Sequence, residues 1–386
     1  MRFRIVIVRT SPDAVLTNAR LALPDAIVEG SLAVESGRIA AVDQGRSSVA
    51  VAEDLGGDYL IPGLIELHTD HLESHLSPRP NVHWPPSSAV LAHDAQVCAS
   101  GITTVFDAIC LGVSEERQVF KDVSVLNVKE AKKKGLLRAD HYIHLRCEVV
   151  HEEAVDFFAP YRDEPLLRMI SLMDHTPGQR QWADIEKYKT YYGWRLNMNS
   201  AELDEMIRRR LDQQHDHAER NRKELFEMVA NREIAFASHD DTEPSHVDEA
   251  AEIGITISEF PTTRSAAEAA RRHDMAIIMG APNVILGGSH SGNVAASELA
   301  KVGLLDALAS DYVPSSLLQG AFELQNTAGF SLPQALAAVT ANPARMVDFN
   351  DRGRLEPGLR ADLVRVRVVD DLPQVVAVWR EGLRVC

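Results

Sequence analysis

The sequence predicts an α/β fold: a (β/α)₈ barrel of the TIM type, with a small β-sandwich domain built from both chain ends. Between residues 59 and 349, short apolar segments alternate with helical ones, which is typical of βα units and parallel strands. Residues 1–58 and 350–386 instead contain short strand-like segments and no long helical period. We therefore expect one small domain made of 1–58 and 350–386, and a barrel made of 59–349.

The strands of the small domain are short and separated by turn residues. Ser36-Gly37 is the expected turn between two of them, because glycine readily adopts the backbone angles of tight turns. The expected strands are residues 19–23, 31–34, 38–42, 361–366 and 375–379.

The barrel range contains seven clear strand candidates. They are residues 61–68, 103–107, 142–148, 169–175, 234–239, 255–260 and 305–311. The expected helices are residues 122–134, 201–231, 266–273 and 294–301. The third barrel strand is expected between Asp107 and Ala139, where no strand pattern stands out.

Composition excludes several classes of protein. The formal net charge is −16, which disfavours nonspecific binding to nucleic acid or to an anionic membrane surface. We find no run of 18 apolar residues and no signal peptide, so neither a membrane span nor secretion is expected. The four cysteines form no Cys-x-x-Cys pair, which favours a reducing compartment, and we expect a cytoplasmic protein.

The first strand candidate ends in His68-Thr69-Asp70. Side chains alternate along a strand, so His68 and Asp70 leave the same face and can bind one divalent cation. Acids and histidines recur at later strand ends, and these ends converge on one face of a barrel. Six such residues are the expected metal ligands: His68, Asp70, Glu148, His175, His239 and Asp311.

This set favours a centre of two divalent ions. Two imidazoles suit one ion, and Glu148 would bridge this ion to a second one. Two ions bridged in this way lie about 3.5–4 Å apart. Bound metal lowers the pKa of water toward roughly 7, and Asp311 would orient that water and accept its proton. The alternative for any single residue is structural. A lone strand-end histidine is more often a hydrogen-bonded residue, and a strand-end glutamate such as Glu148 often pairs with an arginine such as Arg146.

A second group of residues points to an anionic substrate. Arg79, Arg180 and Arg264 lie in loops that follow strand candidates, and guanidinium groups bind phosphate oxygens with two donors. His290 lies in the loop Gly287–Asn293, whose backbone N–H groups lead into a helix start that favours phosphate. The alternatives are surface ion pairs for the arginines and an ordinary helix entry for the loop.

These motifs resemble the amidohydrolase superfamily. The resemblance runs from about Leu60 to Trp379, and within the superfamily it is strongest to the diphosphatases of the carbon–phosphorus lyase pathway. The matching segments are Ile-Pro-Gly-Leu-Ile-Glu-Leu-His68-x-Asp70, Pro78-Arg-Pro80, His144-Leu-Arg-Cys-Glu148, Ser171-Leu-Met-Asp-His175, Ala237-Ser-His-Asp-Asp241, Glu259-Phe-Pro-Thr-Thr263, Gly287–Glu298 and Asn342-Pro343-Ala344.

The resemblance implies a barrel of the amidohydrolase type and carries the superfamily's ligand roles onto the same six residues. Two departures favour oxygen ligands. The first strand reads His-x-Asp rather than His-x-His, and Glu148 stands where many members have a carboxylated lysine. Manganese or iron is therefore expected beside zinc. His71 follows Asp70 and either adds a ligand or packs against its neighbours.

The resemblance further implies hydrolysis of a small-molecule ribosyl triphosphate, with release of pyrophosphate, by an enzyme of phosphonate catabolism. We also expect the chain to form a homo-oligomer. Two alternatives stay open, because a barrel fold does not determine its chemistry. One is a hydrolase of C–N bonds, such as a cyclic amidase or a deaminase. The other is a noncatalytic barrel that serves as a scaffold.

Overall fold

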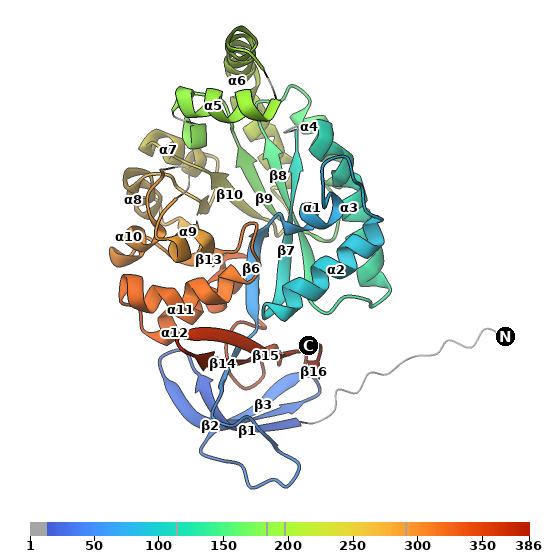
Figure 1. The fold of residues 1–386 in the computed structure, drawn as a ribbon, viewed down its shortest axis with the longest axis vertical. Helices are drawn as coiled ribbons and strands as arrows, with labels where there is room; N and C mark the ends of the chain where they lie inside the picture. Colours follow the sequence, from blue (N-terminus) through green and yellow to red (C-terminus); the bar gives the residue numbers. More distant parts are fainter. Residues whose placement is uncertain (1–13, 113–114, 183, 197, 290–291) are drawn as a thin grey trace, which may run out of the picture.

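A computed structural model describes residues 14–112, 115–182, 184–196, 198–289 and 292–386 (Figure 1). Two separate sheets organise the chain. The barrel fills the upper part of Figure 1, and a sheet built from both chain ends lies below it. The predicted α/β fold is confirmed.

The end sheet is mixed, with strand order β16-β15-β14-β5-β1-β2-β3 and β4 beside β1. Strand β5, from the N-terminal part, pairs in parallel with β1 and antiparallel with β14, from the C-terminal part. The strands are β1 (Ala14–Ala22), β2 (Ile27–Glu35), β3 (Arg38–Gln44), β4 (Glu53–Asp54), β5 (Tyr59–Pro62), β14 (Leu363–Val369), β15 (Leu372–Arg380) and β16 (Leu383–Arg384). Its own apolar core includes Leu32, Leu60 and Trp379.

The barrel sheet contains eight strands in chain order, and all of its pairs are parallel. A parallel bridge between Thr69 and Asp311 joins the last strand region to the first and nearly closes the barrel. The strands are β6 (Leu64–Thr69), β7 (Ile102–Leu111), β8 (Asp140–Glu148), β9 (Leu167–Met173), β10 (Ala235–His239), β11 (Ile257–Glu259), β12 (Ala276–Gly280) and β13 (Ala307–Ala309).

The barrel interior is packed with apolar side chains rather than hollow. One cluster joins residues of seven barrel strands, including Leu67 of β6, Phe106 of β7 and Met169 of β9, and it continues to Phe349. Such layers make the barrel a solid support, so functional groups collect at the carboxyl ends of its strands.

Helices cover the outside of the barrel. They are α1 (His71–Leu76), α2 (Pro86–Ala99), α3 (Glu115–Lys133), α4 (Ala154–Phe158), α5 (Ile185–Leu196), α6 (Ser200–Val229), α7 (Pro244–Glu252), α8 (Arg264–Arg272), α9 (Ala281–Leu286), α10 (Ala296–Lys301), α11 (Ser316–Ala328), α12 (Leu332–Ala337) and α13 (Ala341–Met346). Helix α6 extends beyond the barrel at the top of Figure 1, and the capping box of Asn199 and Glu202 begins it. None of the described helices combines the length and the apolarity that crossing a membrane requires.

Two expectations about the barrel strands were wrong. The third strand does not lie between Asp107 and Ala139, where α3 stands, but is β8 itself. The strand that the sequence pattern missed is β12, a short segment that follows α8 directly. A five-residue apolar run is easily read as the end of the preceding helix.

The expected strand 61–68 is in fact two strands on two sheets. The chain passes from β5 to β6 at Gly63, whose N–H donates to the carbonyl oxygen of Asp362 at 2.8 Å. A Cβ atom at Gly63 would lie only 2.2 Å from Thr103 Oγ1, so only glycine fits this crossing. The end sheet therefore extends to Pro62. That residues 1–58 and 350–386 form one domain and residues 59–349 another stays a prediction.

Candidate metal centre

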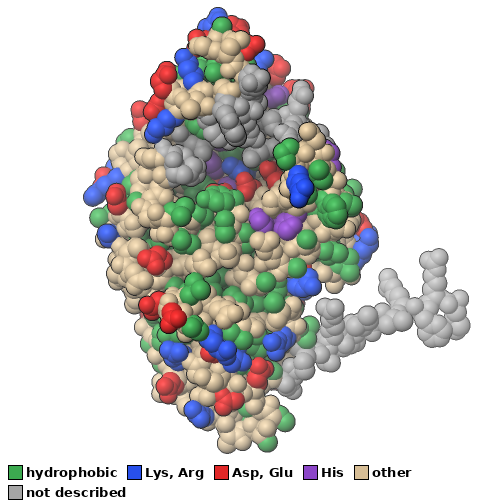
Figure 2. All heavy atoms as spheres, in the orientation of Figure 1, with side chains coloured by type: hydrophobic (Ala, Val, Ile, Leu, Met, Phe, Trp, Pro, Cys, Tyr) green, Lys and Arg blue, Asp and Glu red, His purple; other side chains and the backbone are tan. Residues whose placement is uncertain are grey.

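The six predicted ligands all lie at the carboxyl end of the barrel. His68 lies in β6 and Asp70 just after it, Glu148 ends β8, the third barrel strand, and His239 ends β10. His175 and Asp311 each follow their strand by two residues. Figure 2 shows a hollow over the barrel in which histidine, acidic and basic side chains lie together.

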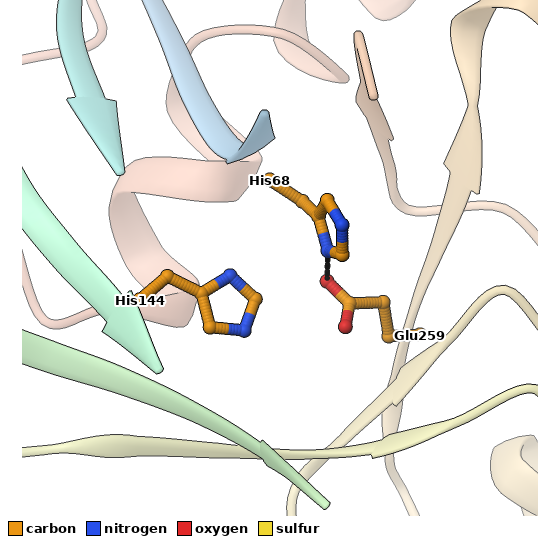
Figure 3. A group of neighbouring side chains, drawn as sticks. All are labelled: His68, His144 and Glu259. Atoms are coloured by element: carbon orange, nitrogen blue, oxygen red, sulfur yellow. Dashed lines mark hydrogen bonds and ion pairs between the residues drawn. The ribbon is translucent and has the colours of Figure 1, made fainter. Parts of the chain in front are cut away.

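His68 is held by a carboxylate from across the barrel. Its Nδ1 lies 2.7 Å from Oε1 of Glu259, which ends β11, and both side chains are almost completely buried (Figure 3). The other oxygen of Glu259 accepts a hydrogen bond of 2.6 Å from Ser171 Oγ. Burial raises the pKa of Glu259, but His68 and His144 outweigh it and hold that pKa well below its usual range. An ionised carboxylate therefore orients the imidazole.

The second nitrogen of His68 has no partner. Nε2 is buried and makes no hydrogen bond. A carboxylate that accepts the Nδ1 proton leaves a lone pair on Nε2, which is the usual arrangement of a metal-binding histidine. Among described residues, His68, His144 and Glu259 form a group whose ligand atoms lie within 4.8 Å of one another.

His144 is a neutral neighbour in this group. Its Nδ1 donates to the carbonyl oxygen of Leu67 at 2.9 Å, and its Nε2 lies 2.5 Å from Ser171 Oγ. Burial is the main cause that lowers the pKa of His144 to about 3. The sequence analysis missed His144, although 144, 146 and 148 alternate onto one face of β8 and signal a polar inner face.

A second group lies at the ends of β9 and β10. Glu148 Oε2 lies 2.6 Å from His175 Nδ1, and Glu148 Oε1 accepts the backbone N–H of His175 at 3.0 Å. His175, His239 and Asp240 bring ligand atoms within 4.8 Å of one another. Glu148 therefore orients His175 in this structure, and its predicted role as a bridge stays a prediction.

His239 lies between the two groups. Its Nδ1 is 2.9 Å from Asp240 Oδ2 and its Nε2 is 3.8 Å from Glu259 Oε2, distances of ion pairs without hydrogen-bond geometry. Burial lowers the pKa of His239, but Asp240 and Glu259 outweigh it and raise that pKa. An imidazole that makes no hydrogen bond and is surrounded by carboxylates is suited to bind a cation, which would displace the ring proton.

Asp311 and Asp70 meet beside one arginine. The Asp70 N–H donates to the carbonyl oxygen of Asp311 at 3.1 Å, and the Asp311 N–H donates to that of His68 at 3.0 Å. Arg146 lies 3.7 Å from Asp70, and its buried Nε has no partner. Burial, followed by the charge of Asp70, raises the pKa of Asp311 above its usual range. Asp311 is therefore a better proton acceptor than an ordinary aspartate.

Three strand ends at this face have left-handed backbone angles without being glycine. Asp240, Phe260 and Asp311 follow β10, β11 and β13, and each has a φ of 56°. Such angles are uncommon for residues with a Cβ and persist where the surrounding structure holds them, often at functional sites. Tight turns of this kind bring Asp240 and Asp311 back toward the strand ends.

The residues at this face fit divalent cations. Carboxylates and imidazoles supply the donors, and His68 and His239 carry buried nitrogens with no hydrogen-bond partner. The six predicted residues do not form one set at ligand spacing: the described groups draw only on His68, His175 and His239 among them. Glu259 and Asp240 were missed, although Glu259 ends an expected strand and the strand-end rule applies to it equally.

The residues predicted to contact the substrate do not form a cluster like that of the predicted metal ligands. Arg180 is buried, pairs with Asp241 and donates to the carbonyl oxygen of His239 at 3.2 Å, so it supports β10. Arg79 and Arg264 are exposed, and Arg264 Nε donates to Glu268 at 2.8 Å. His290 lies outside the described residues. The roles of all four stay predictions.

Known proteins share both sequence and fold with this chain. The model of the "Amidohydrolase family" matches residues 145–385. A protein of Escherichia coli (strain K12), "Alpha-D-ribose 1-methylphosphonate 5-triphosphate diphosphatase", is 44% identical over 376 residues, which cover 96% of this chain and 100% of that protein.

Similar solved structures support the fold. A putative prolidase from Bifidobacterium longum has a TM-score of 0.67 at 16% identity. The match covers 97% of this chain and 95% of the prolidase chain. The D267A mutant of N-acetyl-D-glucosamine-6-phosphate deacetylase from Mycobacterium smegmatis has a TM-score of 0.63 at 16% identity. The match covers 97% of this chain and 99% of the deacetylase chain.

Proposed function

Because this chain belongs to the amidohydrolase family, we propose that it is a metal-dependent diphosphatase of phosphonate catabolism. It hydrolyses α-D-ribose 1-methylphosphonate 5-triphosphate to the corresponding 5-phosphate and pyrophosphate. The observation that carries this proposal is the 44% identity over the full length of a diphosphatase with that substrate. The paired carboxylates and histidines at the barrel end support it, since they suit a hydrolytic centre.

Two divalent cations, zinc, manganese or iron, are the proposed cofactors. His68, oriented by Glu259, would contribute to one site, and His175, His239 and Asp240 to the other, with Asp70, Glu148 and Asp311 beside them. When bound, such cations supply Lewis acidity toward phosphoryl oxygens and a water nucleophile at neutral pH.

Asp311 is the proposed proton acceptor. Water adds across the anhydride between the first and second phosphate groups: a new P–O bond forms, the bridging P–O bond breaks and pyrophosphate leaves. The proton released by the water passes to Asp311, whose raised pKa favours this transfer. The backbone hydrogen bonds that join Asp311 to Asp70 and His68 hold it in place for this step.

Cationic side chains at the same face would bind the triphosphate. Arg146 is the best placed, because it is only 8% exposed and its Nε has no partner. A forked guanidinium that enters a site of carboxylates offsets the repulsion between the substrate and those carboxylates. Arg79, Arg264 and His290 are proposed to contact the phosphate groups farther from the centre, while Arg180 acts through Asp241 by holding β10.

The proposal is tested by pyrophosphate release from a ribosyl triphosphate, with purified protein and added manganese or zinc. We expect turnover by the unaltered chain and almost none by Asp311→Asn. Turnover of a cyclic amide without pyrophosphate release would instead identify a hydrolase of C–N bonds. Absence of both activities, with no bound cation, would identify a noncatalytic scaffold. Assembly as a homo-oligomer and a cytoplasmic location stay proposals.

A further inference from the structure

A second set of histidines lies on the helices that follow the first barrel strands. His71 and His75 are four residues apart on α1, which places them on the same face of that helix. His93 lies on α2. The ring centroids of His71 and His75 are 5.0 Å apart, and His93 lies 6.0 Å from His71 and 5.9 Å from His75.

Each of these three imidazoles has one buried nitrogen with no hydrogen-bond partner. The atoms are Nε2 of His71, Nε2 of His75 and Nδ1 of His93. Buried polar atoms are nearly always paired in proteins, and three orphaned atoms on three adjacent rings call for a ligand. Imidazole nitrogens alone, without carboxylates, form this set.

The opposite nitrogens are engaged in the manner of metal-binding histidines. His71 Nδ1 donates to the carbonyl oxygen of Tyr312 at 3.1 Å, and His93 Nε2 donates to Asp107 Oδ1 at 2.8 Å. When one ring nitrogen donates a hydrogen bond to a carbonyl or carboxylate, the ring is oriented and the other nitrogen keeps its lone pair. His75 has a hydrogen bond to Gln96.

The pKa values of His75 and His93 are shifted toward the neutral form, which is the form that binds a cation. Burial is the largest cause that lowers the pKa of both His93 and His75, and the hydrogen bond that His93 donates to Asp107 does not overcome it. Neutral imidazoles keep their lone pairs at pH 7.

We propose that His71, His75 and His93 form a further cation site, separate from the central one, for a borderline divalent ion of the zinc type. Imidazole suits zinc, copper and nickel, whereas manganese, calcium and magnesium prefer oxygen. With nitrogens at about 2.0–2.1 Å in tetrahedral geometry, ring centroids stand about 5 Å apart. The observed separations of 5.0, 5.9 and 6.0 Å are close to that value.

Binding requires a small rearrangement. His71, His75 and His93 do not together form one of the described groups whose ligand atoms lie within 4.8 Å of one another, so at least one ring must rotate about its side-chain bonds. The side chains of His71 and His75 are only half-buried, which leaves them room to turn. His93, held by Asp107, is the fixed member.

The test is a count of bound ions in the full-length chain. The protein is stripped of metal, dialysed against zinc and analysed for metal per chain, as the unaltered chain, as His75→Gln and as His215→Gln. His215 is an exposed residue of α6 and serves as the matched control. We expect His75→Gln to bind one ion fewer than the other two. Equal zinc contents in all three would overturn the proposal.

A second measurement needs no variant. Diethyl pyrocarbonate modifies free imidazole nitrogens, and peptide mass spectrometry locates the products. Zinc should slow modification of His71 and His75 at least about tenfold while leaving His215 unaffected. Modification of His75 at the same rate with and without zinc contradicts the site, even if His75→Gln fails to fold. Neither readout depends on diphosphatase activity, so failure of the proposed reaction would leave this result separate.

Discussion

Two buried histidines, on barrel strands that are separated by β7, differ because only one of them has a partner for its second ring nitrogen. His68 in β6 and His141 in β8 are both completely buried, and each pairs with a carboxylate through Nδ1, at 2.7 Å and 2.8 Å. The Nε2 of His68 has no partner. The Nε2 of His141 lies 3.3 Å from Asp94.

The extra carboxylate changes the charge of the ring. Burial lowers the pKa of His141, but Asp107 and then Asp94 outweigh it and raise that pKa to about 9. His141 is therefore a cation at neutral pH and has no lone pair to offer. His93, Asp107 and His141 have ligand atoms at metal spacing, yet this set is an internal ion-pair network rather than a metal site. Spacing alone does not identify a ligand; a free lone pair does.

The largest effect is expected from removing an imidazole of the metal centre that makes no hydrogen bond. His239→Asn should lower turnover by on the order of 10³-fold or more, because the centre loses a donor that nothing nearby replaces. Pyrophosphate release and metal content per chain measure the effect. Full activity with unchanged metal content would show that His239 lies outside the centre.

A change in the ion-pair network of His93, Asp107 and His141 should lower the free energy of unfolding instead of the turnover. Asp107→Asn leaves the buried His141 cation with only Asp94, and breaking a buried pair costs about 3–5 kcal/mol. Urea denaturation gives the free energy of unfolding. The exposed pair of Arg264 and Glu268 supplies the control, since Glu268→Gln should cost under about 1 kcal/mol. Equal losses for the two variants would contradict the assignment.

The same network predicts how stability depends on pH. The folded pKa of His141, about 9, lies above the ordinary value of 6.5, so its contribution is complete below pH 6.5 and disappears as the pH rises through 9. The loss is on the order of 3 kcal/mol. Unfolding measured between pH 6 and 10 should show it in the unaltered chain and a weaker dependence in Asp107→Asn. Parallel curves would mean that His141 is neutral.

The smallest effect is expected from changing Glu259, the carboxylate that pairs with His68. Glu259→Gln keeps the shape of the side chain but removes the charge that orients His68, which should weaken metal affinity about 10–100-fold. Activity should return when excess metal is added, unlike in His239→Asn. A variant that no metal concentration rescues would place Glu259 in direct contact with the ion or substrate.

Much of the fold follows from local pattern. Alternation along apolar strands placed His68, Glu148 and His239 at strand ends, because the period of a strand is a property of the backbone itself. Where the apolar run was short, as in β12, the pattern failed, since five residues do not distinguish a strand from a helix end.

Local sequence is enough to predict the type of most segments and the functional groups at their ends. Which side chains come into contact depends on how the strands assemble into the barrel. Glu259 and His68 are 191 residues apart, and their pairing depends on barrel closure and register. Whether a nitrogen ends up satisfied, as in His141, or free, as in His68, depends on partners from other strands, and no local period carries that information.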